Sequence, residues 1–306
     1  MWVLPRILMI AFCLLNASTS LATQPAWHFL PSDVNSLHSK PADYRLPYGN
    51  DSLQFGDLRL PTHTKSPYPV AIIIHGGCWV SGFANIQNTA ALADALRDMG
   101  IATWNIEYRR EDNKGGGWPG TFEDVAHSAD FLRKIARKYS LDLNRVIVIG
   151  HSAGGHLALW LAARHQLPTT SQLYTQQPLT LRGVIVLGGI PDLKAFRKQG
   201  EDVCGSDVVG KLLGSSANQV DKHYKEASPN ELLPLGIPQI LIYGTEDKSV
   251  PLLFGHSYMQ TALKKGDTVK LVEVKYTGHH EYIVPNAVAW PAVKAAVLLL
   301  LNYKQG

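Results

Sequence analysis

The sequence is poor in charge and in cysteine, and it contains no long apolar run. Charged residues make up 18% of the 306 residues, and the net charge of +4 is spread without a basic run, which argues against nucleic acid as a partner. Of the three cysteines, only Cys78 and Cys204 lie beyond the N-terminal residues; two cysteines do not make a disulfide framework, and we expect both to be free thiols. With 45% hydrophobic residues and no internal repeat, the chain is expected to fold as one domain around a large core.

The N-terminal residues differ in character from the rest of the chain. One positive charge, Arg6, precedes an apolar run over Ile7–Leu15, and small residues follow at Ser20–Ala22. This order is typical of a secretory signal peptide, and the run is too short to span a bilayer. We therefore predict a signal peptide over residues 1–22, a mature domain over residues 23–306, and export to the periplasm or the exterior. An uncleaved anchor is the alternative.

One short stretch carries most of the functional information. A β-branched run over residues 146–149 leads into Gly150-His151-Ser152-Ala153-Gly154, and an alanine- and leucine-rich run follows. This pattern predicts a strand, a sharp turn with a serine at its apex, and a helix. Glycine at positions 150 and 154 removes the Cβ atoms that would collide in such a turn. The serine would then stand at a helix N-terminus, where negative charge is favoured.

Apolar runs of strand length alternate with amphipathic runs of helical length along the chain. This alternation predicts an α/β fold with a mostly parallel central sheet and helices on both faces. Residues 23–50 lack periodicity and are expected to form an extended lead-in over the surface. The expected strands cover residues 53–60, 70–74, 101–106, 145–149, 183–187, 239–243 and 269–274, and the clearest expected helices cover residues 89–99, 251–265 and 285–303.

The carboxyl ends of three expected strands carry a serine, an acid and a base. Parallel strands bring their carboxyl ends to one edge of the sheet, so Ser152, Asp247 and His279 are the predicted catalytic residues. A histidine can take the proton of a serine hydroxyl, and an aspartate can hold the histidine tautomer that does so. Asp192 is the alternative acid, and His280 is the alternative base.

A glycine pair follows the buried run at residues 70–74. The backbone N–H groups of Gly76 and Gly77, together with that of Ala153, are predicted to form an oxyanion hole. Trp79 and Trp118 are either packing residues or the wall of a pocket for an aromatic acyl group. We expect neither a metal nor another cofactor, because His279, His280 and Glu281 are adjacent and cannot converge on one ion.

These motifs resemble those of the α/β-hydrolase superfamily, within an acetyl-esterase/lipase-like group that includes feruloyl-esterase-like and kynurenine-formamidase-like enzymes. The resemblance extends from about Tyr48 to the C-terminus and rests on His75–Trp79, Tyr108-Arg109, Gly150–His156, Gly244–Asp247 and Gly278-His279. It implies the same roles for the serine, the acid, the base and the glycine pair. Cys78 stands where lipase-like members often have a third glycine, which is closer to the feruloyl-esterase-like and formamidase-like branches.

Three functions are compatible with these residues. The first is an exported serine carboxylesterase (EC 3.1.1) that cleaves a small ester through an acyl-enzyme. The second is an amide hydrolase, formamidase-like or peptidase-like, on the same fold. The third is an inactive binding protein, although such proteins usually lose a catalytic residue and here Ser152, Asp247 and His279 are all present. The expected partner is a small ester or amide, and the sequence does not specify an oligomeric state.

Overall fold

The computed structural model describes residues 29–302, except 215 and 216. The predicted signal peptide lies outside the described residues. The described residues form an eight-stranded sheet in the order β1-β2-β4-β3-β5-β6-β7-β8. The strands are β1 (Tyr44–Pro47), β2 (Phe55–Arg59), β3 (Tyr68–Ile74), β4 (Ala102–Ile106), β5 (Leu141–His151), β6 (Gly183–Leu187), β7 (Gln239–Gly244) and β8 (Val269–Val274).

The sheet is mostly parallel. Strand β2 is antiparallel to both β1 and β4, and the remaining neighbouring strands are parallel to each other. This arrangement confirms the predicted fold class. The first strand was not predicted, because residues 23–50 were expected to be only an extended lead-in. Its pattern is mostly exposed, so it carries no apolar alternation that would identify it.

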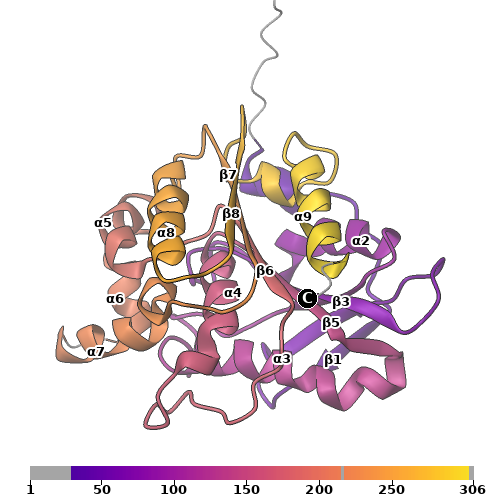
Figure 1. Ribbon diagram of the computed structural model, residues 1–306, viewed down its shortest axis with the longest axis horizontal. Helices are drawn as coiled ribbons and strands as arrows, with labels where there is room; N and C mark the ends of the chain where they lie inside the picture. Colours follow the sequence, from indigo (N-terminus) through magenta and orange to yellow (C-terminus); the bar gives the residue numbers. More distant parts are fainter. Residues whose placement is uncertain (1–28, 215–216, 303–306) are drawn as a thin grey trace, which may run out of the picture.

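Helices cover both faces of the sheet (Figure 1). The helices are α1 (Pro31–Asn35), α2 (Ala90–Asp98), α3 (Gly120–Tyr139), α4 (Ala153–Ala163), α5 (Leu193–Cys204), α6 (Val208–Leu213), α7 (Ala217–Ala227), α8 (Leu252–Lys264) and α9 (Trp290–Asn302), and short 3₁₀ turns are η1 (Ile86–Thr89), η2 (Arg164–Gln166), η3 (Pro229–Leu232) and η4 (Glu281–Ile283). Within the described part of the chain, no helix combines the length and the apolar character needed to cross a bilayer.

The central strands are apolar at every position because both of their sides are buried. In β3, Ile72 and Ile74 pack in the core beneath α3 and α4, whereas Ala71 and Ile73 pack in the core beneath α2 and α9. Alternate side chains of a strand point to opposite faces, so a strand with helices on both faces reads as a continuous apolar run. The predicted buried strand at residues 70–74 is therefore confirmed.

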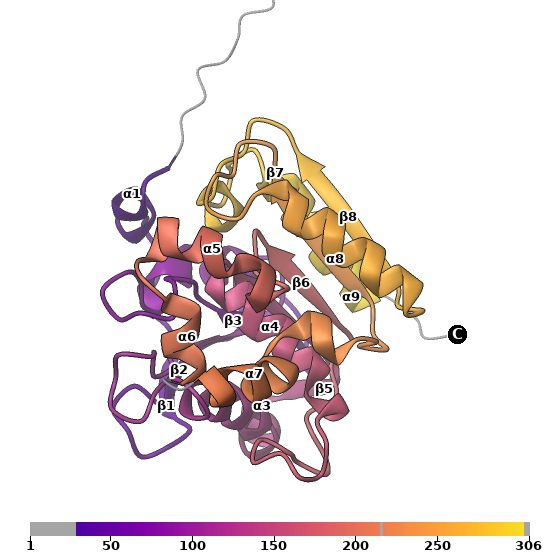
Figure 2. The same ribbon diagram turned by 90° about the vertical axis from the view of Figure 1, so that its left-hand side faces the viewer.

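Helices α5, α6 and α7 form a small helical segment on the α4 and α8 side of the sheet (Figures 1 and 2). The segment begins directly after β6, where the Asp192 side chain accepts hydrogen bonds from the backbone N–H groups of Lys194 and Ala195. Ser228 precedes η3, and its hydroxyl accepts a hydrogen bond from the Leu193 backbone N–H at 3.1 Å. The Leu193–Ser228 hydrogen bond thus ties the start of the segment to the residue that follows α7.

Candidate active site

Ser152 lies in a strained turn between β5 and α4. Its backbone has φ 55° and ψ −122°, a conformation that an L-residue adopts only where its surroundings enforce it. A Cβ atom at position 150 would lie 2.0 Å from the Gly154 carbonyl oxygen, and one at position 154 would lie 2.2 Å from that of Ile74. Glycine is therefore required at both positions, as the sequence pattern predicts.

The structure brings Ser152, His279 and Asp247 into one chain of hydrogen bonds. The Ser152 Oγ lies 2.9 Å from the His279 Nε2, and the His279 Nδ1 lies 2.9 Å from the Asp247 Oδ2. The aspartate side chain is fully buried, and the histidine side chain is 12% exposed. An acceptor carboxylate on Nδ1 requires the proton there, which leaves Nε2 as the acceptor that faces the serine hydroxyl. This is the arrangement that activates a serine.

Asp247 is held from three further directions. Its Oδ1 accepts hydrogen bonds from the backbone N–H groups of Ser249 and Val250, both at 2.9 Å. Its Oδ2 accepts a hydrogen bond from the Tyr282 hydroxyl at 3.0 Å. Burial and the neighbouring carboxylate raise the pKa of Tyr282, so this tyrosine stays a donor. Sequence reasoning did not identify Tyr282, because no local sequence pattern shows that η4 places this residue beside Asp247.

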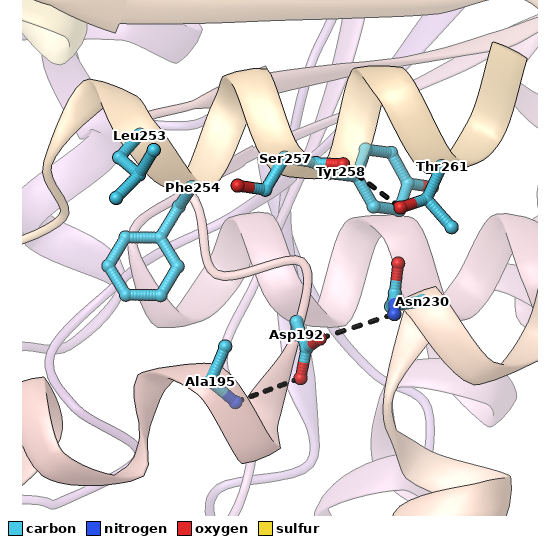
Figure 3. Close-up of a pocket in the computed structure, with 8 residues that line it drawn as sticks. All are labelled: Asp192, Ala195, Asn230, Leu253, Phe254, Ser257, Tyr258 and Thr261. Carbon is cyan, nitrogen blue, oxygen red and sulfur yellow. Dashed lines mark hydrogen bonds between the residues drawn. The ribbon is translucent and has the colours of Figure 1, made fainter.

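Asp192, the alternative acid, occupies a separate pocket (Figure 3). It caps α5, and its Oδ2 accepts a hydrogen bond from the Asn230 side chain at 3.2 Å. Phe254 and Tyr258 of α8 line the same pocket. The carboxylate of Asp192 thus has structural partners of its own and takes no part in the hydrogen bonds of His279.

His280 lies beside the chain of hydrogen bonds without joining it. Its ring stands 5.3 Å from that of His279, and it lines the pocket that contains Ser152. Burial, and then the neighbouring His279, lower the pKa of His280 to about 4. A neutral imidazole at this position contributes polar surface to the pocket, and the hydrogen bonds of the site involve His279 instead.

The loop after β3 passes directly over Ser152. A Cβ atom at Gly76 would lie 3.0 Å from the Ser152 Cβ and 2.9 Å from the His151 carbonyl oxygen, so only glycine fits at this approach. Gly77 has φ 97° and lines the pocket together with Ser152. Ala153 is the first residue of α4, where the backbone N–H has no partner within the helix. The three predicted oxyanion-hole residues therefore flank the serine.

A buried network holds this loop to the end of β4. Glu107 accepts hydrogen bonds from the His75 Nε2 at 2.9 Å and from the Ile86 backbone N–H at 3.0 Å, and it pairs with Arg110. The Tyr108 hydroxyl donates to the His75 carbonyl oxygen at 2.9 Å. Burial alone would raise the pKa of Glu107, but His75 and Arg110 outweigh it and lower that pKa to about 2. The Tyr108-Arg109 pair is part of the sequence resemblance, but no sequence pattern indicates the partners of Glu107.

Cys78 and Cys204 are joined by a disulfide, so the prediction of two free thiols is wrong. Their Cα atoms lie 5.6 Å apart, although 126 positions separate them in the sequence. Cys78 follows Gly77 in the loop above Ser152, and Cys204 is the last residue of α5. The pairing depends on where the helical segment packs against the β3 loop, and no spacing of two isolated cysteines indicates that placement.

The pocket at Ser152 is a cavity of about 220 Å³ with mostly apolar walls. Its apolar lining includes Phe83, Phe196, Val203, Val250 and the disulfide. None of the described residues that line it is an aspartate, glutamate, lysine or arginine. Among the residues that the structure describes, no group of three or more histidine, cysteine, aspartate or glutamate side chains could hold a metal ion.

Neither tryptophan considered as a pocket wall lines this cavity. Trp79 is fully buried and contacts the rings of His156 and Phe196 edge-on, with centroids 5.2 and 6.3 Å away. Trp118 stacks on the ring of His223 at 4.4 Å. Both side chains pack the helical segment against the body of the domain, and the phenylalanine rings that line the pocket are those of Phe83 and Phe196.

Two curated relatives and one solved structure indicate what the chain resembles. The chain is 27% identical to "Esterase LipC" of Mycobacterium tuberculosis over 84% of its own length and 64% of that protein. It is 25% identical to "Probable isoprenylcysteine alpha-carbonyl methylesterase ICME" of Oryza sativa subsp. japonica over 74% of its own length and 55% of that protein. The chain thus spans less than two thirds of the length of either relative.

A solved structure titled "Truncated form of carbohydrate esterase from gut microbiota" superposes with a TM-score of 0.72 over 86% of this chain and 99% of that one, at 20% identity. This likeness confirms the α/β-hydrolase fold. The model of the BD-FAE family matches residues 57–261, which is more than half of the chain and includes Ser152 and Asp247. The acetyl-esterase/lipase-like resemblance is confirmed, and the chain belongs to the BD-FAE family.

Proposed function

We propose that the protein is a serine carboxylesterase that hydrolyses a small, uncharged ester through an acyl-enzyme. The observation that carries the proposal is the chain of two 2.9 Å hydrogen bonds from Ser152 through His279 to Asp247. A serine hydroxyl is a weak nucleophile until a base takes its proton, and this geometry supplies the base and its orienting acid. The family and the esterase relatives support the same reaction class.

The proposed reaction has two steps. As the Ser152 Oγ attacks the ester carbonyl carbon, its proton passes to the His279 Nε2, and Asp247 stabilises the resulting imidazolium. The N–H groups of Gly76, Gly77 and Ala153 accommodate the negative charge on the carbonyl oxygen. His279 then gives its proton to the alcohol that leaves. In the second step, water attacks the carbonyl carbon of the acyl-enzyme while His279 takes its proton. His279 then returns the proton to the Ser152 Oγ, which releases the acid and restores Ser152.

The lining of the pocket favours an uncharged ester. Among the side chains that the structure describes, no carboxylate, ammonium or guanidinium group lines the cavity, so a charged substrate would lose its hydration without gaining a counter-ion from them. Amino-acid amides carry such charges, and a peptidase-like substrate therefore fits this pocket less well than an uncharged ester does. The apolar side chains of Phe196, Val203 and Val250 suit a short acyl group or a compact aromatic one.

Comparison of the Ser152→Ala variant with wild type on p-nitrophenyl acetate and butyrate tests the proposal. The variant should lose at least about 10³-fold in kcat/KM while its melting temperature is retained. Ser257→Ala is the matched control, because Ser257 is exposed on α8 and should behave as wild type. Activity of Ser152→Ala within about tenfold of wild type would contradict the proposal. Faster turnover of an N-formyl amide than of every ester would favour the amide hydrolase instead.

We also propose that residues 1–22 are removed and that the domain is exported. The disulfide between Cys78 and Cys204 supports this, because such bonds persist in oxidising compartments and are rare in the cytosol. N-terminal sequencing of the protein expressed in full length should find a mature chain that begins near residue 23. A chain that keeps Met1 in the cytosolic fraction would contradict export.

A further inference from the structure

The Cys78–Cys204 disulfide joins two independent walls of the pocket at Ser152. Cys78 belongs to the loop after β3, and Cys204 ends α5 of the helical segment. Both cysteines line the cavity together with Gly77 and Ser152. The bond therefore connects the predicted oxyanion loop to α5, a helix that is not part of the sheet.

The loop has a backbone conformation that must be held from outside. Gly77 has φ 97°, and Cys78 and Trp79 both have φ 57°. Left-handed backbone is unfavourable for an L-residue by about 1–2 kcal/mol, so two such residues in succession persist only where their surroundings enforce them. If the contacts that enforce this conformation weakened, the backbone at Gly77 would have more favourable conformations available to it.

The loop is restrained on two sides. On the β4 side, the Trp79 carbonyl oxygen accepts a hydrogen bond from the Glu111 N–H at 2.8 Å, and Tyr108 holds the His75 carbonyl oxygen. On the α5 side, the restraints are the disulfide and the edge-on contact of Trp79 with Phe196 at 6.3 Å. Of the two restraints on the α5 side, only the disulfide is covalent, and it acts on the residue directly after Gly77.

We infer that the Cys78–Cys204 disulfide is a positioning element for the oxyanion loop, so that ester turnover depends on the bond being formed. The inference rests on the proposed function. A dithiol such as dithiothreitol reduces the bond by forming its own cyclic disulfide, which leaves two thiols on the protein. The released loop would no longer hold the Gly77 N–H against the developing oxyanion. Because that contact is strongest in the transition state, kcat should fall more than KM rises.

The test compares the hydrolysis of p-nitrophenyl acetate by wild type and by the Cys78→Ser/Cys204→Ser double variant. The concentration of active sites in each sample is taken from the amount of serine that a fluorophosphonate labels once labelling is complete, and kcat is expressed per labelled serine. The double variant should lose at least about tenfold in kcat while KM changes by less than about threefold. Dithiothreitol should lower the kcat of wild type to the same level, and reoxidation should restore it. The reagent should not affect the double variant, which lacks the bond.

Leu212→Ala is the control for lost stability. Leu212 is buried in α6, so the variant weakens the packing of the helical segment but keeps the disulfide. It should lower the melting temperature and leave kcat per labelled serine unchanged. If the double variant does not fold, reduction of folded wild type at constant circular dichroism gives the same comparison.

A kcat within about twofold of wild type, in the double variant or after reduction of wild type, would overturn the inference and leave the bond a purely stabilising role. This outcome differs from failure of the proposed function. If the proposed function were wrong, the wild-type protein with its disulfide intact would neither hydrolyse esters nor react with the fluorophosphonate.

Discussion

The Nε2–H of His151 donates a hydrogen bond to the backbone carbonyl oxygen of His279 at 2.7 Å. A carbonyl oxygen can only accept, so this nitrogen carries the proton. Burial, and then the nearby His279 and His280, lower the pKa of His151 well below its ordinary value, which keeps the ring neutral. His151, the residue directly before Ser152, thus holds the backbone of His279, the proposed base. The serine that gives up the proton and the histidine that accepts it are therefore held in position relative to each other.

Replacement of His151 should therefore affect turnover more than binding. We expect His151→Ala to lower kcat about tenfold with little change in KM, because His279 loses a restraint on its position. His151→Gln retains an N–H donor and should recover part of the loss. Steady-state kinetics on p-nitrophenyl acetate measures both effects. His127→Ala, on the exposed face of α3, serves as the control, and a kcat for His151→Ala that matches this control would exclude a positioning role.

The two candidate acids can be separated by the same conservative change. Asp247→Asn should lower kcat by about 10³–10⁴-fold, because an amide no longer favours the imidazole tautomer with its proton on Nδ1. Asp192→Asn should leave kcat unchanged and, since an asparagine still caps α5, should alter the free energy of unfolding by only a few tenths of a kcal/mol. Equal losses of kcat in the two variants would contradict the assignment of Asp247.

Glu107 should contribute to stability through its buried ion pair with Arg110 and its hydrogen bond with His75. Glu107→Gln leaves Arg110 and His75 in a buried site without a carboxylate, which we expect to cost about 3–5 kcal/mol of unfolding free energy. Urea denaturation followed by circular dichroism measures this loss. The exposed Glu201→Gln is the matched control and should change stability by less than about 0.5 kcal/mol. A similarly small effect at Glu107 would show that the network is dispensable for folding.

Buried neutral histidine should make the fold sensitive to acid. Burial lowers the pKa of His156 to about 4, whereas the unfolded chain has the ordinary value of about 6.5. Between these values the unfolded state binds more protons than the folded state, so stability falls as the pH falls. The expected slope is about 1.4 kcal/mol per pH unit for this one group. Urea titrations from pH 7.5 to 4.5 measure the slope.

His156→Gln provides the comparison for that titration. A glutamine can still donate to the Ala227 carbonyl oxygen, which His156 contacts at 2.9 Å, but it does not titrate. The variant should show a shallower slope than wild type over the same pH range. Parallel slopes for the two proteins would contradict the assignment of the acid sensitivity to His156.

The parts of the fold that sequence predicts are those with a strong local signal. Strand β3 reads as a buried strand because both of its faces are covered, and the turn at Ser152 is identified by the glycines that its backbone geometry requires. Asp247 and His279 are found because strand ends gather at one edge of a parallel sheet. The patterns of β3 and of the turn at Ser152 each lie within a single segment, and the strand ends follow from the alternation of strands and helices along the chain.

The parts that escape prediction depend on contacts between distant segments. Strand β1 has an exposed pattern and exists because it pairs with β2. Tyr282 reaches Asp247 only after η4 turns back over the site, and Cys204 meets Cys78 only once α5 packs against the β3 loop. Residue spacing along the chain does not indicate which distant segments contact each other, so the three-dimensional structure is needed to find these contacts.

Covalent labelling tests the proposed nucleophile most directly. A fluorophosphonate forms a stable bond with a serine only where a base and an oxyanion hole activate it. Incubation of the folded wild-type protein, followed by peptide mapping, should find one modified residue, Ser152, and the Ser152→Ala variant should remain unmodified. Labelling at another serine, or no labelling of the folded wild-type protein, would contradict the proposal that Ser152, His279 and Asp247 form a catalytic site.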